Sequence, residues 1–339
     1  MPSCFTALLL RRLREHIQKF QESSSLHPGF GLGHGPGAVP KQGWLEQPLD
    51  PFNASDRRTF LQRYWVNDQH RTGQDVPVFL HIGGEGSLGP GSVMAGHPAA
   101  LAPAWGALVI SLEHRFYGLS MPAGGLDLAL LRYLSSRHAL ADVASARQAL
   151  SGLLNVSSSS PWICFGGSYA GSLATWARLK FPHLVFAAVA SSAPLSAVVD
   201  FSAYNQVVAR SLTQVAIGGS LECLAAASTA FTEVERLLRA GPAAQAVLRE
   251  ELGACGSLDL TEDQAELLGA LQALVGGTVQ YDGQAGAPLS VRQLCGLLLG
   301  KWGNRSRSTP YLGLRRAVQM SPVRVFSVLF PSSQHCPSS

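Results

Sequence analysis

Residues 162–181 restrict the fold more than any other part of this sequence, because an apolar run passes directly into a helical pattern. Residues 162–166 have the composition of a buried strand, and residues 169–181 have that of a helix. Ser168 lies at the bend between them. A strand that joins a helix through so short a link is typical of a sheet whose strands are connected by helices.

Four other segments have strand character and alternate with helical sequence. They are residues 59–67, 76–82, 107–113 and 184–192. Between the last two, residues 139–154 place four apolar side chains close to one helical face. These are Leu140, Val143, Leu150 and Leu154. Strands that alternate with helices predict an α/β fold with a parallel-rich sheet and helices on both faces.

The composition divides the chain into four parts. Residues 1–43 are a predicted flexible lead-in, because residues 23–43 are rich in Gly, Pro and Ser. Residues 44–200 contain the alternating strands and helices. Residues 201–319 contain helical patterns without strands, so we interpret them as a helical cap inserted over the sheet. Residues 320–339 form a tail that ends in a Ser/Pro-rich stretch.

Three helix starts in the predicted cap are indicated by capping residues. Ser220 has the position of an N-cap residue. Thr261 is followed three residues later by Gln264, and Ser290 is followed three residues later by Gln293. Both pairs have the spacing of a capping box, in which each residue bonds to the other's backbone.

Charge and cysteine spacing exclude several functions. A net charge of +4 with no long Lys/Arg run is not that of a nucleic-acid-binding protein. No segment is apolar over the ~18 residues that a membrane span needs. The six cysteines form no CxxC pair, so we predict no metal or cofactor. Asn-x-Ser sequons at Asn53, Asn155 and Asn304 favour a glycoprotein of the secretory pathway, although no signal peptide is recognisable.

Ser168 has the surroundings of a nucleophile on a strained strand-to-helix turn. Residues two positions before and after such a serine crowd together, so only small side chains fit there. Gly166 and Ala170 meet this requirement, Gly167 adds a second small residue, and Gly171 allows the helix to start close to the strand. The alternative interpretation is an ordinary glycine-rich turn.

A second glycine-rich segment lies where an oxyanion hole requires it. The N–H of Tyr169, at the start of the helix, would face a developing negative charge. The other donor is expected from the loop after an earlier strand, which carries Gly83, Gly84 and Glu85. Two such motifs in the correct order favour the nucleophile interpretation of Ser168.

The base and the acid that would serve this serine are harder to place. Only His183 and His335 follow Ser168, and neither stands after a predicted strand. His183 ends the helix that leaves the turn, so we expect it far from the Ser168 hydroxyl. The acid candidates lie in or beside the helical segment, where solvated helix faces and helix starts explain them. They are Asp200, Asp259, Asp263 and Asp282.

Five motifs in order resemble the prolyl carboxypeptidase and dipeptidyl-peptidase family of serine peptidases. They are FLQRYWVND, FLHIGGEGSLGPG, LEHRFYGLS, ALADVASA and CFGGSYAGSLATWARLKFPHL, and the resemblance covers about residues 40–318. It implies an α/β-hydrolase core with a helical cap, secretory, endolysosomal or vesicular residence, and Ser168 as nucleophile. It also implies that the acid, the base and the final strands lie beyond the cap, outside these residues, and that residues 320–339 are unrelated to the family.

The expected function is therefore that of a serine-type exopeptidase that cleaves peptides near proline through an acyl-enzyme. Two alternatives stay open, a catalytically incompetent truncated product and an esterase or lipase with the same turn. In the loop at 112–118, we expect Glu113 to pair with Arg115, and we consider His114 as a substitute base. Glu85 is a candidate for holding the amino group of a peptide.

Overall fold

The computed structural model describes residues 39–254, 257–301 and 309–321. The chain divides after Ala197 into two compact units, which are described separately. The first is an α/β unit that contains Ser168, and the second consists of helices. The division falls three residues before the boundary expected from the sequence.

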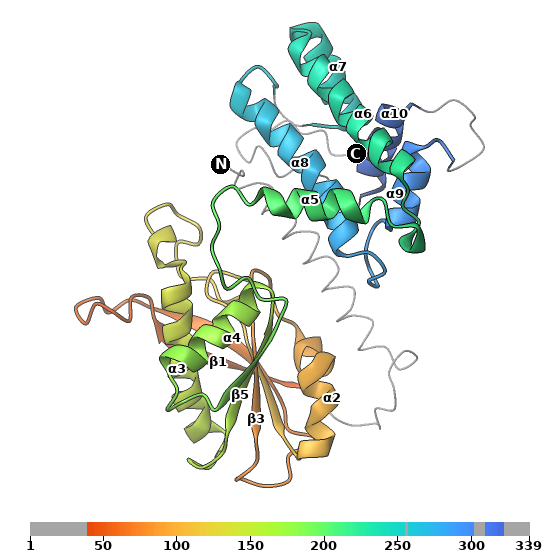
Figure 1. The fold of residues 1–339 in the computed structure, drawn as a ribbon. Helices are drawn as coiled ribbons and strands as arrows, with labels where there is room; N and C mark the ends of the chain where they lie inside the picture. Colours follow the sequence, from red (N-terminus) through yellow and green to blue (C-terminus); the bar gives the residue numbers. More distant parts are fainter. Residues whose placement is uncertain (1–38, 255–256, 302–308, 322–339) are drawn as a thin grey trace. The chain divides into compact units, whose positions relative to one another are not determined.

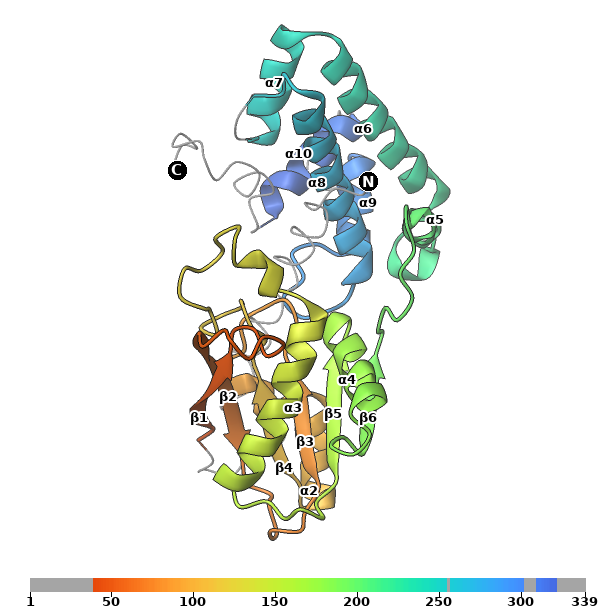
Figure 2. The ribbon, with the colours of Figure 1, turned by 90° about the vertical axis from the view of Figure 1, so that its left-hand side faces the viewer.

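A six-stranded mixed sheet forms the centre of the α/β unit, in the order β1-β2-β4-β3-β5-β6 (Figure 2). Its strands are β1 (Lys41–Pro48), β2 (Thr59–Asn67), β3 (Val78–Ile82), β4 (Leu108–Leu112), β5 (Trp162–Gly167) and β6 (Ala187–Ser191). The first two strands run antiparallel to their neighbours, and β4, β3, β5 and β6 are parallel. The predicted parallel-rich α/β sheet is confirmed.

Three helices cover the two faces of this sheet, and Figure 1 shows α2 (Gly96–Trp105) on one side. On the other side lie α3 (Ser136–Leu153) and α4 (Tyr169–Lys180). Alternate residues of β3 serve the two faces, since Leu80 packs in the cluster of α3 and α4 whereas Phe79 packs in that of α2. This alternation is the period of two that a strand buried on both faces requires.

The register brings the carboxyl ends of β3, β4 and β5 to one edge of the sheet. Ile82 is opposite Leu112, and His81 is opposite Phe165. The residues that follow these three strands therefore start side by side. In open α/β sheets, ligands bind beyond the carboxyl ends of the parallel strands.

The strands predicted from the sequence all form, but one strand was missed. The N-terminal edge strand β1 begins at Lys41, inside the segment that was predicted to be a flexible lead-in up to residue 43. Its sequence is polar and contains a glycine and a proline, so neither alternation nor apolar runs revealed it. Pairing with β2 over eight residues makes it a strand. A neighbour in the fold outweighs a weak local preference here.

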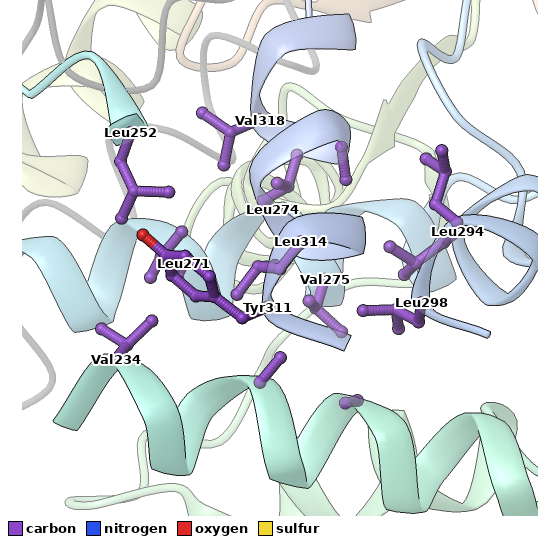
Figure 3. Packing of buried hydrophobic residues seen from close by; sticks show 14 of the residues in the cluster. Val234, Leu252, Leu271, Leu274, Val275, Leu294, Leu298, Tyr311, Leu314 and Val318 are labelled. Atoms are coloured by element: carbon purple, nitrogen blue, oxygen red, sulfur yellow. The ribbon is translucent and has the colours of Figure 1, made fainter. Parts of the chain in front are cut away.

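The helical unit has its own apolar core (Figure 3). Its α-helices are α5 (Ser202–Ser211), α6 (Leu221–Arg239), α7 (Pro242–Leu252), α8 (Thr261–Gln280), α9 (Val291–Leu298) and α10 (Pro310–Met320). Val234 of α6, Leu271 of α8 and Leu314 of α10 are among the side chains that meet in this core. No helix in the described part of the chain is both long and apolar enough to cross a membrane. That this unit caps the sheet stays a prediction.

All three predicted helices start within one residue of the expected position, but only two of the three predicted caps are confirmed. The Ser220 hydroxyl accepts from the N–H of Cys223, and Ser290 with Gln293 forms a full capping box. The prediction for Thr261 is wrong, because α8 already includes Thr261 and has Leu260 as its N-cap residue. The amide of Gln264 instead donates to the carbonyl of Leu258.

A disulfide between Cys223 and Cys295 links α6 to α9 within the helical unit. It closes a loop of 72 residues, and such a bond persists in oxidising compartments. Cys255 lies outside the described residues. In the α/β unit, Cys164 is free and fully buried on β5, and burial raises the pKa of its thiol to about 12. It acts as a small apolar core residue.

Candidate active site

Ser168 stands on a sharp turn between β5 and α4, with φ of 55° and ψ of −129°. A positive φ is rare for a residue with a side chain, and holding it costs about 1–3 kcal/mol. The turn is fixed on both sides, since the Ser168 N–H donates to the carbonyl of Ser191 and its own carbonyl accepts from Ser172. This is the strained serine that the sequence predicted.

The small residues around the turn differ in how strictly they are required. A Cβ at Gly166 would lie 2.2 Å from the carbonyl oxygen of Ala170, and one at Gly171 would lie 2.9 Å from that of Gly166. Both positions therefore exclude larger residues. Ala170 is itself buried. A Cβ at Gly167 would meet only an ordinary contact at 3.9 Å, so this glycine is not sterically required.

Two backbone N–H groups at this edge of the sheet are available to a ligand. Tyr169 is the first residue of α4, where N–H groups have no acceptor within the helix. Among the residues that the structure describes, the N–H groups of Tyr169 and Gly84 both lack a backbone acceptor. They are the donors to which a developing oxyanion could bond.

Gly83 has a different role from the donor that the sequence suggested. Its N–H already donates to the carbonyl of Leu112 at 2.9 Å. A Cβ at this position would lie 2.8 Å from that same carbonyl oxygen and 3.0 Å from the N of His114. Gly83 is thus a point of close approach between the ends of β3 and β4, and its N–H is already bonded.

Glu113, at the end of β4, does not pair with Arg115 as expected. Its carboxylate is fully buried and binds Arg63 of β2 at 2.6 Å. It also accepts from the N–H of Leu88 and from the backbone and hydroxyl of Ser120. A Cβ at position 118 would collide with this carboxylate, so only glycine fits there. Glu113 therefore joins the loop after β3 to the loop after β4.

Arg115 instead pairs with Asp142 of α3, and both side chains are almost completely buried. Its Nε donates to one carboxylate oxygen at 2.7 Å, and its Nη2 donates to the other at 2.6 Å. The guanidinium also donates to the backbone carbonyls of Pro48, Leu49 and Tyr133. Burial raises the pKa of Asp142 to about 6, so the carboxylate is charged at neutral pH.

His114 contacts the residue that follows the candidate nucleophile. Its Nδ1 lies 2.6 Å from the carbonyl of Arg115, and its Nε2 lies 3.0 Å from the hydroxyl of Tyr169. A carbonyl can only accept, so Nδ1 carries the proton and Nε2 accepts from Tyr169. Burial lowers the pKa of His114 to about 4, which keeps the ring neutral.

The pKa of His114 predicts a pH dependence of stability. Because the folded-state pKa lies below the unfolded value of 6.5, folding releases a proton between pH 6.5 and 4. As the pH falls from 6.5 to 4, His114 alone should lower the free energy of unfolding by about 3 kcal/mol. Urea denaturation at several pH values, compared between the wild type and His114→Gln, isolates this contribution and cancels that of Asp142. A constant difference between the two proteins would contradict it.

The remaining candidate residues lie in several parts of the chain. His183 is exposed after the end of α4, and His335 lies outside the described residues. All four acid candidates belong to the helical unit, where Asp282 accepts from the N–H of Val291. Asn53 and Asn155 are exposed, whereas Asn304 lies outside the described residues. Glycosylation at all three stays a prediction.

Sequence reasoning missed Arg63 and Asp142, and it considered His114 only as a substitute base. These residues bond to partners far away in the sequence, and no local pattern connects them. Buried charge was the available signal, since ALADVASA places Asp142 on the apolar side of a helix. In the described ranges, no three His, Cys, Asp or Glu side chains cluster as metal ligands.

Comparisons with known proteins place the chain among serine peptidases. The family described as Serine carboxypeptidase S28 matches residues 47–330, including residues 320–330 of the tail that was expected to be unrelated. Human thymus-specific serine protease is 78% identical over 314 residues, 93% of this chain and 61% of that protein. Mouse lysosomal Pro-X carboxypeptidase is 37% identical over 155 residues, 45% of this chain and 32% of that protein.

Solved structures with a similar arrangement are more distant. Oligopeptidase B from Leishmania major has a TM-score of 0.30 and 20% identity, over 48% of this chain and 21% of that one. The chain spans about three fifths of the length of the human relative. The family match covers most of the chain, and the strand order and the turn at Ser168 fit an α/β-hydrolase fold. The chain therefore belongs to the serine carboxypeptidase S28 family of α/β-hydrolase serine peptidases.

Proposed function

We propose that this chain carries the nucleophile of a serine-type exopeptidase that cleaves peptides near proline. The observation that carries the proposal is the backbone of Ser168. This residue has a positive φ and stands between β5 and the start of α4, at the carboxyl edge of the sheet. A strained serine beside unpaired N–H groups is the arrangement that acyl transfer uses. The family supports the reaction class, and the mouse relative, a Pro-X carboxypeptidase, supports the preference for proline.

In the proposed reaction, the Ser168 Oγ attacks the peptide carbonyl and gives its proton to a general base. The carbonyl oxygen becomes an oxyanion that accepts from the N–H groups of Tyr169 and Gly84, with Glu85 N–H as a further candidate donor. The carbon–nitrogen bond then breaks and the amine leaves with a proton from the base. Water next attacks the ester on Ser168, which releases the acid and restores the hydroxyl.

The general base and its acid are proposed to come from outside the described residues. His114 is not that base, because its accepting nitrogen is occupied by Tyr169. A polypeptide restricted to residues 39–321 is therefore expected to turn over little substrate, since loss of a triad member removes several orders of magnitude of rate. Glu85 remains a candidate for the amino group of a peptide.

The proposed location is an endolysosomal or secretory compartment. The Cys223–Cys295 disulfide requires oxidising conditions to form. Two relatives bear the name lysosomal Pro-X carboxypeptidase, from mouse and from cattle. Both observations fit passage through the secretory pathway.

A fluorophosphonate probe tests the nucleophile directly. In a chain of the relatives' full length, we expect rapid labelling at Ser168, located by peptide mass spectrometry. A shorter chain of residues 39–321 should label slowly. Labelling at a different serine would overturn the assignment. Efficient labelling of the shorter chain would show that a base is present within it.

A substrate panel tests the reaction class. Peptides with proline next to the scissile bond, matched peptides with alanine there, and short-chain esters are compared by kcat/KM. We expect the proline peptides to be cleaved best. Preference for esters over every peptide would favour an esterase with the same serine turn.

A further inference from the structure

The N–H groups of Tyr169 and Gly84, the two principal donors in the proposed reaction, are both tied to the end of β4. The consecutive residues Glu113 and His114 follow this strand directly. Glu113 bonds to the loop that carries Gly84, and His114 bonds to Tyr169. Neither contact involves Ser168 itself. The spacing between the two donors therefore depends on one short segment.

Glu113 fixes the loop after β3 by a hydrogen bond to Leu88. Its Oε1 accepts from the N–H of Leu88 at 2.9 Å, while Arg63 donates to the carbonyl of the same residue at 2.7 Å. Arg63 also binds Glu113, so the three groups form a closed ring of hydrogen bonds. Leu88 is buried, four residues after Gly84. The loop is thus fixed at both ends, by this ring and by the Gly83–Leu112 bond.

His114 holds the other donor across a strand. Tyr169 follows β5 and His114 follows β4, and β3 lies between those strands in the sheet. The hydrogen bond between the two side chains therefore spans the exit of β3. The carbonyl of Arg115 fixes the ring of His114 from its other nitrogen. Arg115 is in turn held by Asp142.

We propose that Glu113 and His114 are positioning residues that set the distance between the two oxyanion donors, Glu113 through the loop of Gly84 and His114 through Tyr169. This inference rests on the proposed function of Ser168. An oxyanion donor works only when it lies about 2.7–3.1 Å from the place where the oxyanion forms. Displacement by about 1 Å can cost roughly 100-fold in rate. Such a displacement should weaken binding of the transition state more than binding of the substrate, because the carbonyl oxygen carries less negative charge in the substrate.

Two conservative variants test the two arms. Tyr169→Phe keeps the backbone N–H and the ring but removes the hydroxyl that bonds to His114. Glu113→Asp keeps the charge but draws the carboxylate back from Leu88. For each, made in a chain of the relatives' full length, we expect kcat on a peptide substrate to fall by about 10- to 100-fold with KM changed by less than about twofold. The double variant Tyr169→Phe with His114→Gln should be no slower than the slower single variant, because both remove the same bond.

Ser111→Ala is the matched control. Ser111 lies on β4 and is fully buried, and its hydroxyl lies 2.6 Å from that of Ser92, eight residues after Gly84 and outside the bonds of Glu113 and His114. It should keep kcat near the wild-type value even if the melting temperature falls. Unchanged kcat in both Tyr169→Phe and Glu113→Asp would overturn the inference, as would an equal loss in the control. In either case, continued labelling of Ser168 by fluorophosphonate in the wild type would show that the proposed function itself stands.

Discussion

In a chain of the relatives' full length, Ser168→Gly should abolish the proposed peptidase activity and yet make the protein more stable than Ser168→Ala. Both variants lack the hydroxyl, and removal of the nucleophile from a serine peptidase costs about 10⁶-fold in kcat. They differ in the turn. Glycine adopts a φ of 55° with a ψ of −129° without the clash of a Cβ, whereas alanine keeps the strain. We expect the glycine variant to have the larger free energy of unfolding, by about 1–2 kcal/mol.

The comparison needs a control, because glycine also increases the entropy of the unfolded chain. Ser151 provides it, since it lies within α3 and its hydroxyl bonds to the carbonyl of Arg147. At this helical position, Ser151→Gly should be less stable than Ser151→Ala by about 0.5–1 kcal/mol. The order of the two variants is therefore opposite at the two serines. Urea denaturation measures both pairs, and the same order at both positions would show that the turn stores no strain.

Such strain at Ser168 was predictable because its causes are local. The apolar run before it, the helix after it and the small residues around it all lie within ten residues. Gly166 is required by a contact with Ala170, four positions away. Short-range steric limits of this kind leave a pattern in the sequence. The strands β3, β4 and β5 were predictable for a similar reason, because each is a continuous apolar run.

The network that surrounds Ser168 was not predictable, because its partners are distant in the sequence. Their closeness in the sequence suggested that Glu113 pairs with Arg115, but the chain leaves β4 after Leu112 and Arg115 already belongs to the following turn. Glu113 therefore reaches Arg63 on the neighbouring strand, and Arg115 reaches Asp142 on α3. Only the packing of the sheet decides which charge is nearest.

Asp142→Ala should lower the free energy of unfolding by about 3–5 kcal/mol, because it leaves the guanidinium of Arg115 buried and unpaired. The pair has two bonds of 2.6 and 2.7 Å, and neither side chain is more than 2% exposed. Urea denaturation at pH 7 measures the loss. Glu233→Ala is the control, since Glu233 pairs with Arg236 on an exposed helix surface and should have little measurable effect.

The same variant should also slow catalysis, and the double variant Asp142→Ala with Arg115→Met separates the two effects. Removing both charges ends the desolvation cost, so the double variant should lose less stability than the sum of the single variants. The double variant does not restore the bonds through which Asp142 fixes Arg115 in the loop after β4. Arg115 would no longer anchor the carbonyl that accepts from His114, and Tyr169 would lose its fixed partner. We therefore expect kcat to stay low although stability partly returns. Recovery of kcat together with stability would show that this ion pair serves the fold alone.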